Sequence, residues 1–555
     1  MDVAGSIPVA SAIFFVFLPK KSDSNLSEGK KEKRMGIARK LQHLSLSPAT
    51  WSVERLKEFF EFFARYGGTG ILLDYKTAFP YTGTLKNLRA ANAYTEQEIG
   101  ELCAHAEKLG LEIIPKGISF SHAEAILKCP EFADLADGKA LNLAREESVE
   151  LLLESSRQLI QLHPGCRMVH LGGDEIFQFT LAPESYAFAS VHGKSGLYVD
   201  FLNRFAERAG KWNLSFGIWS DMLIRYPEAI DSLNRNYTIF YWDYWGFGER
   251  CPFLSIGGGC SDILLLDRKA LPRDLGKILR NSNVRNAEEI PCGLLERYQP
   301  YWELPADRRS VRSFPYIRYF RDHGFRVISS CLTYPEKGSV LSNFAEKLDH
   351  VRSFARRSLE DGAEGMLSCY WSPFWPDLEL MEPAIRIYLE LCEQPDRSDR
   401  QLLDSCVPDG WTRNAFELYL RTANDFEFND FLSIEWTRAD YRKQIDWLRR
   451  AGLADEELQR CRDTIRIGKA FLAEHPENDL FHATVEELLF RAELEENALA
   501  GNPPPPDAMK KLERYEADCR ERHQTASRPV DAAERETLRF QALRDYLAAF
   551  GENGN

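Results

Sequence analysis

Eight short apolar segments, most of them separated by helical stretches, constrain the fold of this chain more than any other feature. The segments lie near residues 41–46, 70–74, 111–116, 167–172, 214–219, 237–242, 326–331 and 365–370. Helical periodicity fills the stretches between them, for example at 53–66 and 95–109. Strands that alternate with helices at this spacing run parallel. The sequence therefore predicts the α/β class and a (β/α)8 TIM barrel.

The pattern changes along the 555 residues in a way that predicts the domain organisation. We expect a poorly ordered N-terminal leader at 1–36, the barrel at 37–394 and an α-helical C-terminal domain at 395–555. An irregular insertion near 246–318, with a strand candidate at 263–266, either overhangs one end of the barrel or is a purely structural excursion. The helical domain either packs against the barrel or mediates homodimerisation, and both alternatives stay open.

Two adjacent carboxylates follow the fourth apolar segment, in the run His170, Leu171, Gly172, Gly173, Asp174 and Glu175. An Asp-Glu pair by itself usually marks a solvated helix start, but here a strand and a turn-forming glycine pair precede it. In a barrel, side chains at the carboxyl end of a strand carry the chemistry. Adjacent acids suit sugar chemistry, because one carboxyl group can protonate a leaving oxygen while its ionised neighbour stabilises positive charge.

This run resembles the signature of glycoside hydrolase family 20, the exo-β-N-acetylhexosaminidases. Residues 121–124 resemble the Gly-His-x-Glu segment of the hexosaminidase D-like branch, with Ser121 where Gly is usual. Residues 72–81 are similar to the Leu-Leu-Glu-Tyr-x-x-x-Phe-Pro-Tyr segment of that branch, with Lys76 and Thr77 in place of acidic residues. Further matches at 219–222 and 241–244 extend the resemblance over roughly residues 38–390.

The resemblance implies an enzyme, an exo-acting β-N-acetylhexosaminidase that removes terminal β-linked GlcNAc or GalNAc from a glycan or glycoconjugate. Its mechanism would be retaining and substrate-assisted, through an oxazolinium intermediate. Glu175 would be the general acid and then the base, and Asp174 would stay ionised and orient the acetamido group. Tyr244 is the first choice as donor to the acetamido oxygen and Tyr241 the second, because residues 241 and 244 of an alternating strand should point in opposite senses.

Further substrate contacts are expected at the strand ends and in the loops that follow them. Each candidate also has a structural interpretation: tryptophans are often core residues, a histidine is often satisfied by a neighbour, and an acid often caps a helix. Glu382 is an alternative to Glu379 for the outer sugar hydroxyls. The candidate substrate-binding residues are His122, Trp219, Trp242, Asp243, Tyr241, Trp371, Asp74, Asp221 and Glu379.

Two other functions are compatible with the sequence. One is a catalytically inactive barrel that binds glycans. The other is a glycosidase in which a carboxylate acts as nucleophile on a sugar without an acetamido group. Retention of both acids and of the tyrosines favours the hexosaminidase over the inactive barrel.

Composition narrows the choice of partners, cofactors and location. A net charge of −14 argues against nucleic acid. No Cys or His spacing resembles a metal site and residues 257–259 lack the other residues of a phosphate loop, so we expect no metal and no cofactor. The 12 cysteines are scattered and are expected to be mostly reduced, with a structural disulfide as the alternative. Residues 7–18 are too short for a membrane span. No basic segment precedes them and the basic stretch 30–34 lies on their far side, which favours a cytoplasmic location over export.

Overall fold

The computed structural model describes a large part of the chain. The described residues are 36–47, 50–256, 262–270, 283–290, 292–333, 344–371, 378–422, 441–450, 452, 454–475, 479–526 and 532–551. Outside these ranges lie residues 1–35 of the leader predicted at 1–36, the apolar run at 7–18 within it and the glycines at 257–259.

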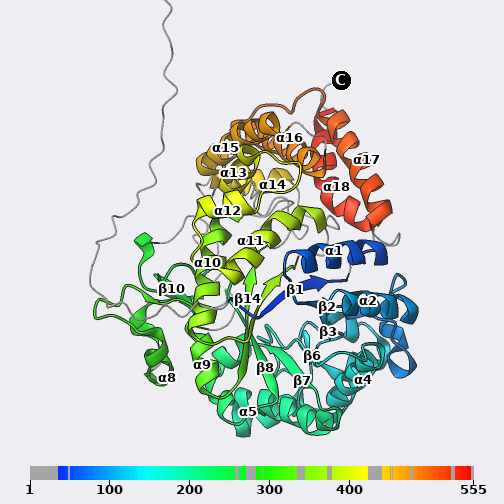
Figure 1. Cartoon of the computed structure of the whole chain (residues 1–555), viewed down its shortest axis with the longest axis vertical. Helices are drawn as coiled ribbons and strands as arrows, with labels where there is room; N and C mark the ends of the chain where they lie inside the picture. Colours follow the sequence, from blue (N-terminus) through cyan, green and yellow to red (C-terminus); the bar gives the residue numbers. More distant parts are fainter. Residues whose placement is uncertain are drawn as a thin grey trace, which may run out of the picture. The chain divides into compact units, whose positions relative to one another are not determined.

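Eight parallel strands close into a barrel in the order β1-β15-β14-β8-β7-β6-β3-β2, with helices around it (Figure 1). Each strand coincides with one of the eight predicted segments, so the predicted α/β barrel is confirmed. The strands are β1 (Arg39–Ser45), β2 (Gly70–Asp74), β3 (Glu112–Lys116), β6 (Met168–His170), β7 (Ser215–Trp219), β8 (Tyr237–Trp242), β14 (Arg326–Leu332) and β15 (Gly365–Cys369).

Helices follow most strands and pack their apolar faces on the outside of the barrel. Local capping sets where the first two begin: the Ser52 hydroxyl accepts from the backbone N–H of Arg55, and Thr95 and Glu98 form a reciprocal capping box. The helices of this part of the chain are α1 (Val53–Arg65), α2 (Glu96–Lys108), α3 (Glu124–Leu127), α4 (Glu146–Leu162), α5 (Pro183–Ala209), α6 (Asp221–Arg225), α9 (Tyr316–Asp322), α10 (Phe344–Glu360) and α11 (Glu382–Glu393).

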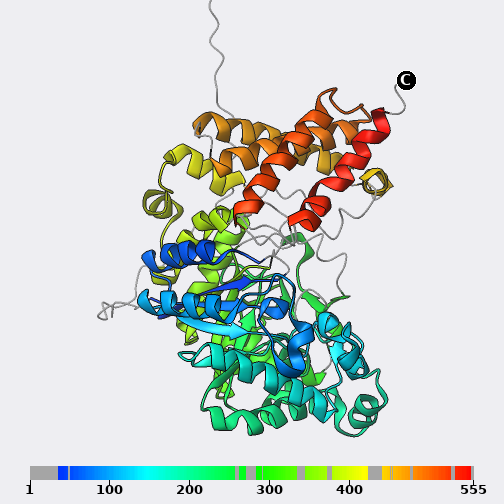
Figure 2. The ribbon, with the colours of Figure 1, turned by 90° about the vertical axis from the view of Figure 1, so that its right-hand side faces the viewer.

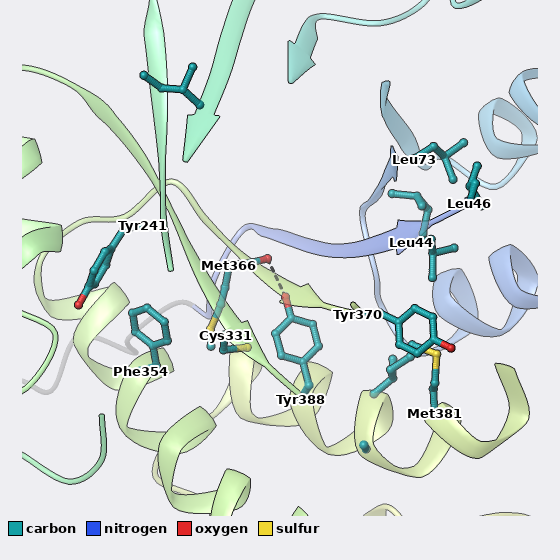
Figure 3. Close-up of a cluster of buried hydrophobic side chains, with 14 of the residues drawn as sticks. Leu44, Leu46, Leu73, Tyr241, Cys331, Phe354, Met366, Tyr370, Met381 and Tyr388 are labelled. Atoms are coloured by element: carbon teal, nitrogen blue, oxygen red, sulfur yellow. Dashed lines mark hydrogen bonds between the residues drawn. The ribbon is translucent and has the colours of Figure 1, made fainter. Parts of the chain in front are cut away.

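Strand side chains alternate between two hydrophobic cores. One core contains buried residues from all eight strands, which is only possible inside the barrel; its strand members are Leu41, Leu72, Ile114, Met168, Trp219, Phe240, Ile328, Leu332, Leu367 and Cys369. The alternate side chains belong to a larger core between the strands and the helices. In Figure 3, Tyr241 lies beside Phe354 in this outer layer, and the Tyr388 hydroxyl donates to the Met366 carbonyl at 2.6 Å.

The predicted insertion between β8 and β14 has its own small sheets. β9 (Arg250–Cys251) pairs antiparallel with β13 (Val311–Arg312), while β11 (Asp262–Leu265) lies between β10 (Phe253–Ser255) and β12 (Asn283–Arg285). α8 (Cys292–Trp302) precedes β13. The strand predicted at 263–266 is therefore present as β11.

The C-terminal region is helical in its described residues, as predicted. In Figure 2 its last helices, coloured orange to red, lie side by side, and α15 contacts α16 while α17 contacts α18. The domain boundaries at residues 36 and 394 stay predictions. The helices are α12 (Asp399–Ser405), α13 (Arg413–Thr422), α14 (Tyr441–Arg450), α15 (Ala454–Glu474), α16 (Leu480–Ala500), α17 (Ala508–Ala526) and α18 (Ala532–Gly551).

The described residues also bear on the cysteines and on membrane-spanning helices. The cysteines within the described ranges are free thiols, and most of them are buried. None of the helices in the described part of the chain combines the length and the apolar character that a bilayer span needs.

Candidate active site

The turn after β6 carries the two predicted catalytic acids. Gly172 and Gly173 have φ angles of +79° and +88°, which side chains with a Cβ rarely adopt. A Cβ on Gly173 would lie only 2.5 Å from Cζ of Phe120. The turn therefore needs glycine at these two positions. β6 ends at His170, two residues before the end of the predicted segment. Asp174 and Glu175 follow directly, and Glu175 itself has a φ of +55°.

Asp174 is mostly covered, and two side chains contact its carboxylate. The Ser121 hydroxyl donates to its Oδ1 at 3.0 Å, and Nε2 of His122 lies 3.4 Å from its Oδ2. Burial opposes ionisation, but the His122 hydrogen bond, the His122 charge and the Lys116 ammonium together hold the pKa of Asp174 at about 2. Asp174 is therefore a carboxylate throughout the neutral range.

His122 lies between the two acids. Its Nε2 is 3.5 Å from Oε2 of Glu175, close to its distance from Asp174, and half of its side chain is exposed. Hydrogen bonds to Asp174 and Glu175 raise the pKa of His122 to about 10 although burial opposes this. His122 is thus an imidazolium at neutral pH. Glu175 is more exposed than Asp174, with 39% of its side chain accessible against 18%.

Four aromatic residues form a wall at the ends of the neighbouring strands. The indole of Trp371 donates to the Tyr244 hydroxyl at 2.7 Å, the ring of Tyr244 lies 5.0 Å from that of Trp242, and Trp219 lies 5.6 Å from Trp371. Tyr241 is absent from this group, because it points outward and its ring packs 5.6 Å from Phe354. The structure brings Tyr244 together with the three predicted tryptophans, and their contacts with a sugar stay predictions.

Asp221 connects the acid pair to this wall. Its Oδ2 accepts from the backbone N–H of Glu175 at 2.6 Å and its Oδ1 accepts from the indole of Trp242 at 3.3 Å. Its side chain is buried, with 1% of the residue exposed. Burial, and then the negative charge of Asp174, raise the pKa of Asp221 to about 7.

Comparison with known proteins identifies the family of the region that carries this site. Residues 73–251 match the description "glycosyl hydrolase family 20, catalytic domain". This stretch, which runs from β2 to β9, is similar to the family 20 catalytic domain. It includes Asp174, Glu175, His122 and Asp221, and the resemblance predicted from the sequence is confirmed.

Individual relatives match only part of the chain. Hexosaminidase D of Bos taurus and of Homo sapiens are 34% and 32% identical to it over 216 residues, which is 37% of this chain. That stretch is 62% of the bovine protein and 44% of the human one, so the match spans less than two thirds of either relative. Among solved structures, a β-N-acetylhexosaminidase from Bacteroides fragilis NCTC 9343 is 15% identical, with a TM-score of 0.42, over 65% of this chain and 68% of that one.

Two aspartates predicted to contact sugar hydroxyls have partners within the protein instead. Asp74 has no exposed surface, and the ammonium of Lys116 lies 2.7 Å from its Oδ2. Although burial raises the pKa of Asp74, the charges of Lys116 and Lys76 outweigh it and lower that pKa. Asp243 shapes the turn after β8, because its Oδ1 accepts from the backbone N–H groups of residues 245 and 246 at 3.0 and 2.8 Å.

Glu379 and Glu382 lie beside arginines of the outer helices. Glu379, in the 3-10 turn Leu378–Met381, forms an ion pair with Arg55 of α1. Glu382 begins α11, and burial raises its pKa to about 7 although Arg55, among other arginines, opposes this. Within the described residues, neither glutamate has a recorded contact with Asp174 or Glu175.

Sequence reasoning missed two residues that act on Asp174, one by a hydrogen bond and one by its charge. Ser121 was noted only as a departure from the usual glycine, yet it donates to Asp174 and accepts from the backbone N–H of Gly173 at 3.1 Å. Lys116 is a buried cation at the end of β3, and a lysine directly after the apolar residues 113–115 was an available signal. Within the described part of the chain, no group of three or more His, Cys, Asp or Glu side chains is arranged to hold a metal ion.

Proposed function

We propose that this protein is an exo-acting β-N-acetylhexosaminidase that hydrolyses terminal β-linked GlcNAc or GalNAc by a retaining, substrate-assisted mechanism. The observation that carries the proposal is the pair Asp174 and Glu175 at the carboxyl end of β6. One acid is covered and ionised, the other is accessible, and an aromatic wall adjoins them. The family 20 match over residues 73–251 supports the same activity.

In the first step of this mechanism, the acetamido oxygen of the substrate attacks the anomeric carbon. The bond to the leaving oxygen breaks, and Glu175 gives its proton to that oxygen. Asp174 accepts a hydrogen bond from the acetamido N–H and stabilises the positive charge of the oxazolinium. In the second step, Glu175 takes a proton from water, which attacks the anomeric carbon and opens the oxazolinium ring with net retention.

The aromatic wall has two roles in the proposal. The Tyr244 hydroxyl donates to the acetamido oxygen and so aligns it for attack. The indole of Trp371 already donates to the same hydroxyl, and a donor to an oxygen strengthens its O–H as a donor in turn. Trp242 supplies apolar surface for the sugar face and the acetamido methyl group, while Trp219, which is 1% exposed, packs against Trp371 and supports the wall from the barrel core.

The test is release of nitrophenol from an aryl β-N-acetylglucosaminide by the purified full-length chain. Glu175→Gln is expected to lower kcat/KM by about 10²- to 10⁴-fold, because it removes the transferable proton. Glu154→Gln, on the outer face of α4, is the matched control and should retain activity. A thiazoline that mimics the oxazolinium should bind far more tightly than the substrate.

Other outcomes would overturn the proposal in specific ways. Binding of the glycoside without turnover would indicate the glycan-binding barrel. Hydrolysis of aryl glycosides without an acetamido group, together with insensitivity to the thiazoline, would indicate a carboxylate nucleophile. A panel of GlcNAc and GalNAc aryl glycosides then defines the substrate preference.

A further inference from the structure

The backbone of Glu175 is in a conformation that its own side chain disfavours. Its φ of +55° lies in the left-handed region, where residues with a Cβ are uncommon. The two preceding glycines, which are suited to positive φ, do not remove this cost at residue 175. Such a conformation persists only where surrounding contacts hold it, and it is commonly found at functional sites.

The contact that holds this backbone comes from the end of the next strand. Oδ2 of Asp221 lies 2.6 Å from the backbone nitrogen of Glu175, and the Asp221 side chain is buried. Above the raised pKa of Asp221, which is about 7, the group is a carboxylate, and a short hydrogen bond from an amide to a carboxylate is stronger than one between neutral groups. The second oxygen accepts from the indole of Trp242. One carboxylate therefore connects the ends of β6, β7 and β8.

Two simpler roles for Asp221 do not fit these contacts. As a ligand for a sugar hydroxyl it would need an accessible oxygen, but the residue is 1% exposed and each oxygen already accepts a hydrogen bond. As a helix cap it would bond the first turn of α6, but its recorded partners belong to Glu175 and Trp242, outside that helix. The negative charges of Asp174 and Glu175 also repel a carboxylate at this position. A neutral side chain would not incur this repulsion.

We propose that Asp221 is a positioning residue that holds the Glu175 backbone in its left-handed conformation and fixes Trp242 at the same point. The proton-donating carboxyl group and the aromatic wall are then held in one geometry. This inference rests on the proposed hexosaminidase activity for its kinetic consequences. The backbone consequence is independent of that activity.

Asp221→Asn cannot keep both hydrogen bonds as they are, because an amide has only one oxygen to accept from the two N–H donors. We expect the variant to bind substrate with a KM within about threefold of the wild type, and kcat to fall about 10²-fold because Glu175 is misplaced. A crystal structure of the variant should show residue 175 outside the left-handed region or in more than one conformation. Trp242→Phe should leave φ of residue 175 positive, because it removes only the second hydrogen bond.

Asp137 is a matched control, because it is also a buried carboxylate that accepts hydrogen bonds from backbone N–H groups. It is also 1% exposed, and its Oδ1 accepts from the backbone N–H groups of Leu181 and Ala182 at 2.6 and 2.9 Å. Asp137→Asn should keep kcat within about threefold of the wild type, because that contact lies six residues beyond Glu175.

The outcomes distinguish the inference from the proposed function. An Asp221→Asn variant with unchanged kcat and an unchanged left-handed residue 175 would overturn the positioning role. An equal fall in kcat for Asp137→Asn and Asp221→Asn would overturn it as well, since the effect would then be general loss of structure. A wild-type chain without hydrolase activity would overturn the proposed function, and the two crystal structures would still decide what Asp221 does to the backbone.

Discussion

Asp221→Asn should also change how the stability of this protein depends on pH. Burial and the charge of Asp174 raise the pKa of Asp221 from 3.8 to about 7. The unfolded chain loses this proton near the ordinary value, whereas the folded chain keeps it until about pH 7. The folded state thus binds more protons in this window, so the contribution of Asp221 to the free energy of unfolding falls as the pH rises.

The magnitude follows from the separation of the two pKa values. Because each pH unit of separation is worth about 1.4 kcal/mol, the full loss is about 4 kcal/mol, and about 3 kcal/mol of it falls between pH 4.5 and pH 8. A chain of this length has an unfolding entropy on the order of 1 kcal/mol/K, so this corresponds to about 3 °C in Tm. The amide that Asp221→Asn introduces does not titrate, so the variant does not incur the loss.

The assay is differential scanning calorimetry of the wild type and Asp221→Asn at matched pH values from 4.5 to 8. The Tm of the variant relative to the wild type should rise by about 3 °C across this window. Loss of one hydrogen bond lowers the free energy of unfolding of the variant by about 1 to 3 kcal/mol at every pH. This constant loss does not change how the Tm difference depends on pH. Asp221→Ala should show the same slope with a larger constant loss. A Tm difference that stays constant with pH would refute the raised pKa and the charge interactions behind it.

Two other variants test the turn and its charges. Gly173→Ala should lower the free energy of unfolding by about 2 kcal/mol or more in urea titrations, because φ is +88° and the new Cβ meets Phe120, whereas Gly100→Ala, with open space around it, should not be destabilising. His122→Gln removes the cation that holds the pKa of Asp174 at about 2 against the effect of burial. The pKa of Asp174 should therefore rise, and the acid limb of kcat/KM against pH should move to higher pH; an unmoved limb would mean that Asp174 does not govern that limb.

The sequence predicted the barrel well because its strands are short apolar runs bounded by turn signals. The segment expected at 365–370 is β15 (Gly365–Cys369), and the segment at 70–74 is β2 without change. The gathering of candidate residues was predictable for a related reason, since side chains after parallel strands lie at one end of a barrel. Tyr244 and Trp371, 127 residues apart in sequence, meet there by a hydrogen bond.

Contacts whose partners depend on register were not predictable in this way. Glu379 was expected near the sugar and is paired with Arg55, and Asp74 was expected to face a ligand and is covered by Lys116. Asp221 was a candidate sugar contact, and it bonds the backbone of a residue 46 positions earlier. No local pattern encodes these pairings.

Local periodicity and a short motif were enough to predict the strands, the glycine turn after β6 and the resemblance of the acid pair to the family 20 signature. Only the folded chain shows which side chains enclose each acid, and therefore why Asp174 is covered and ionised while Glu175 is more exposed. The physical reason is that closing eight strands into a barrel fixes the stagger between neighbouring strand ends. That stagger brings Ser121, His122 and Asp221 onto the turn of Asp174 and Glu175.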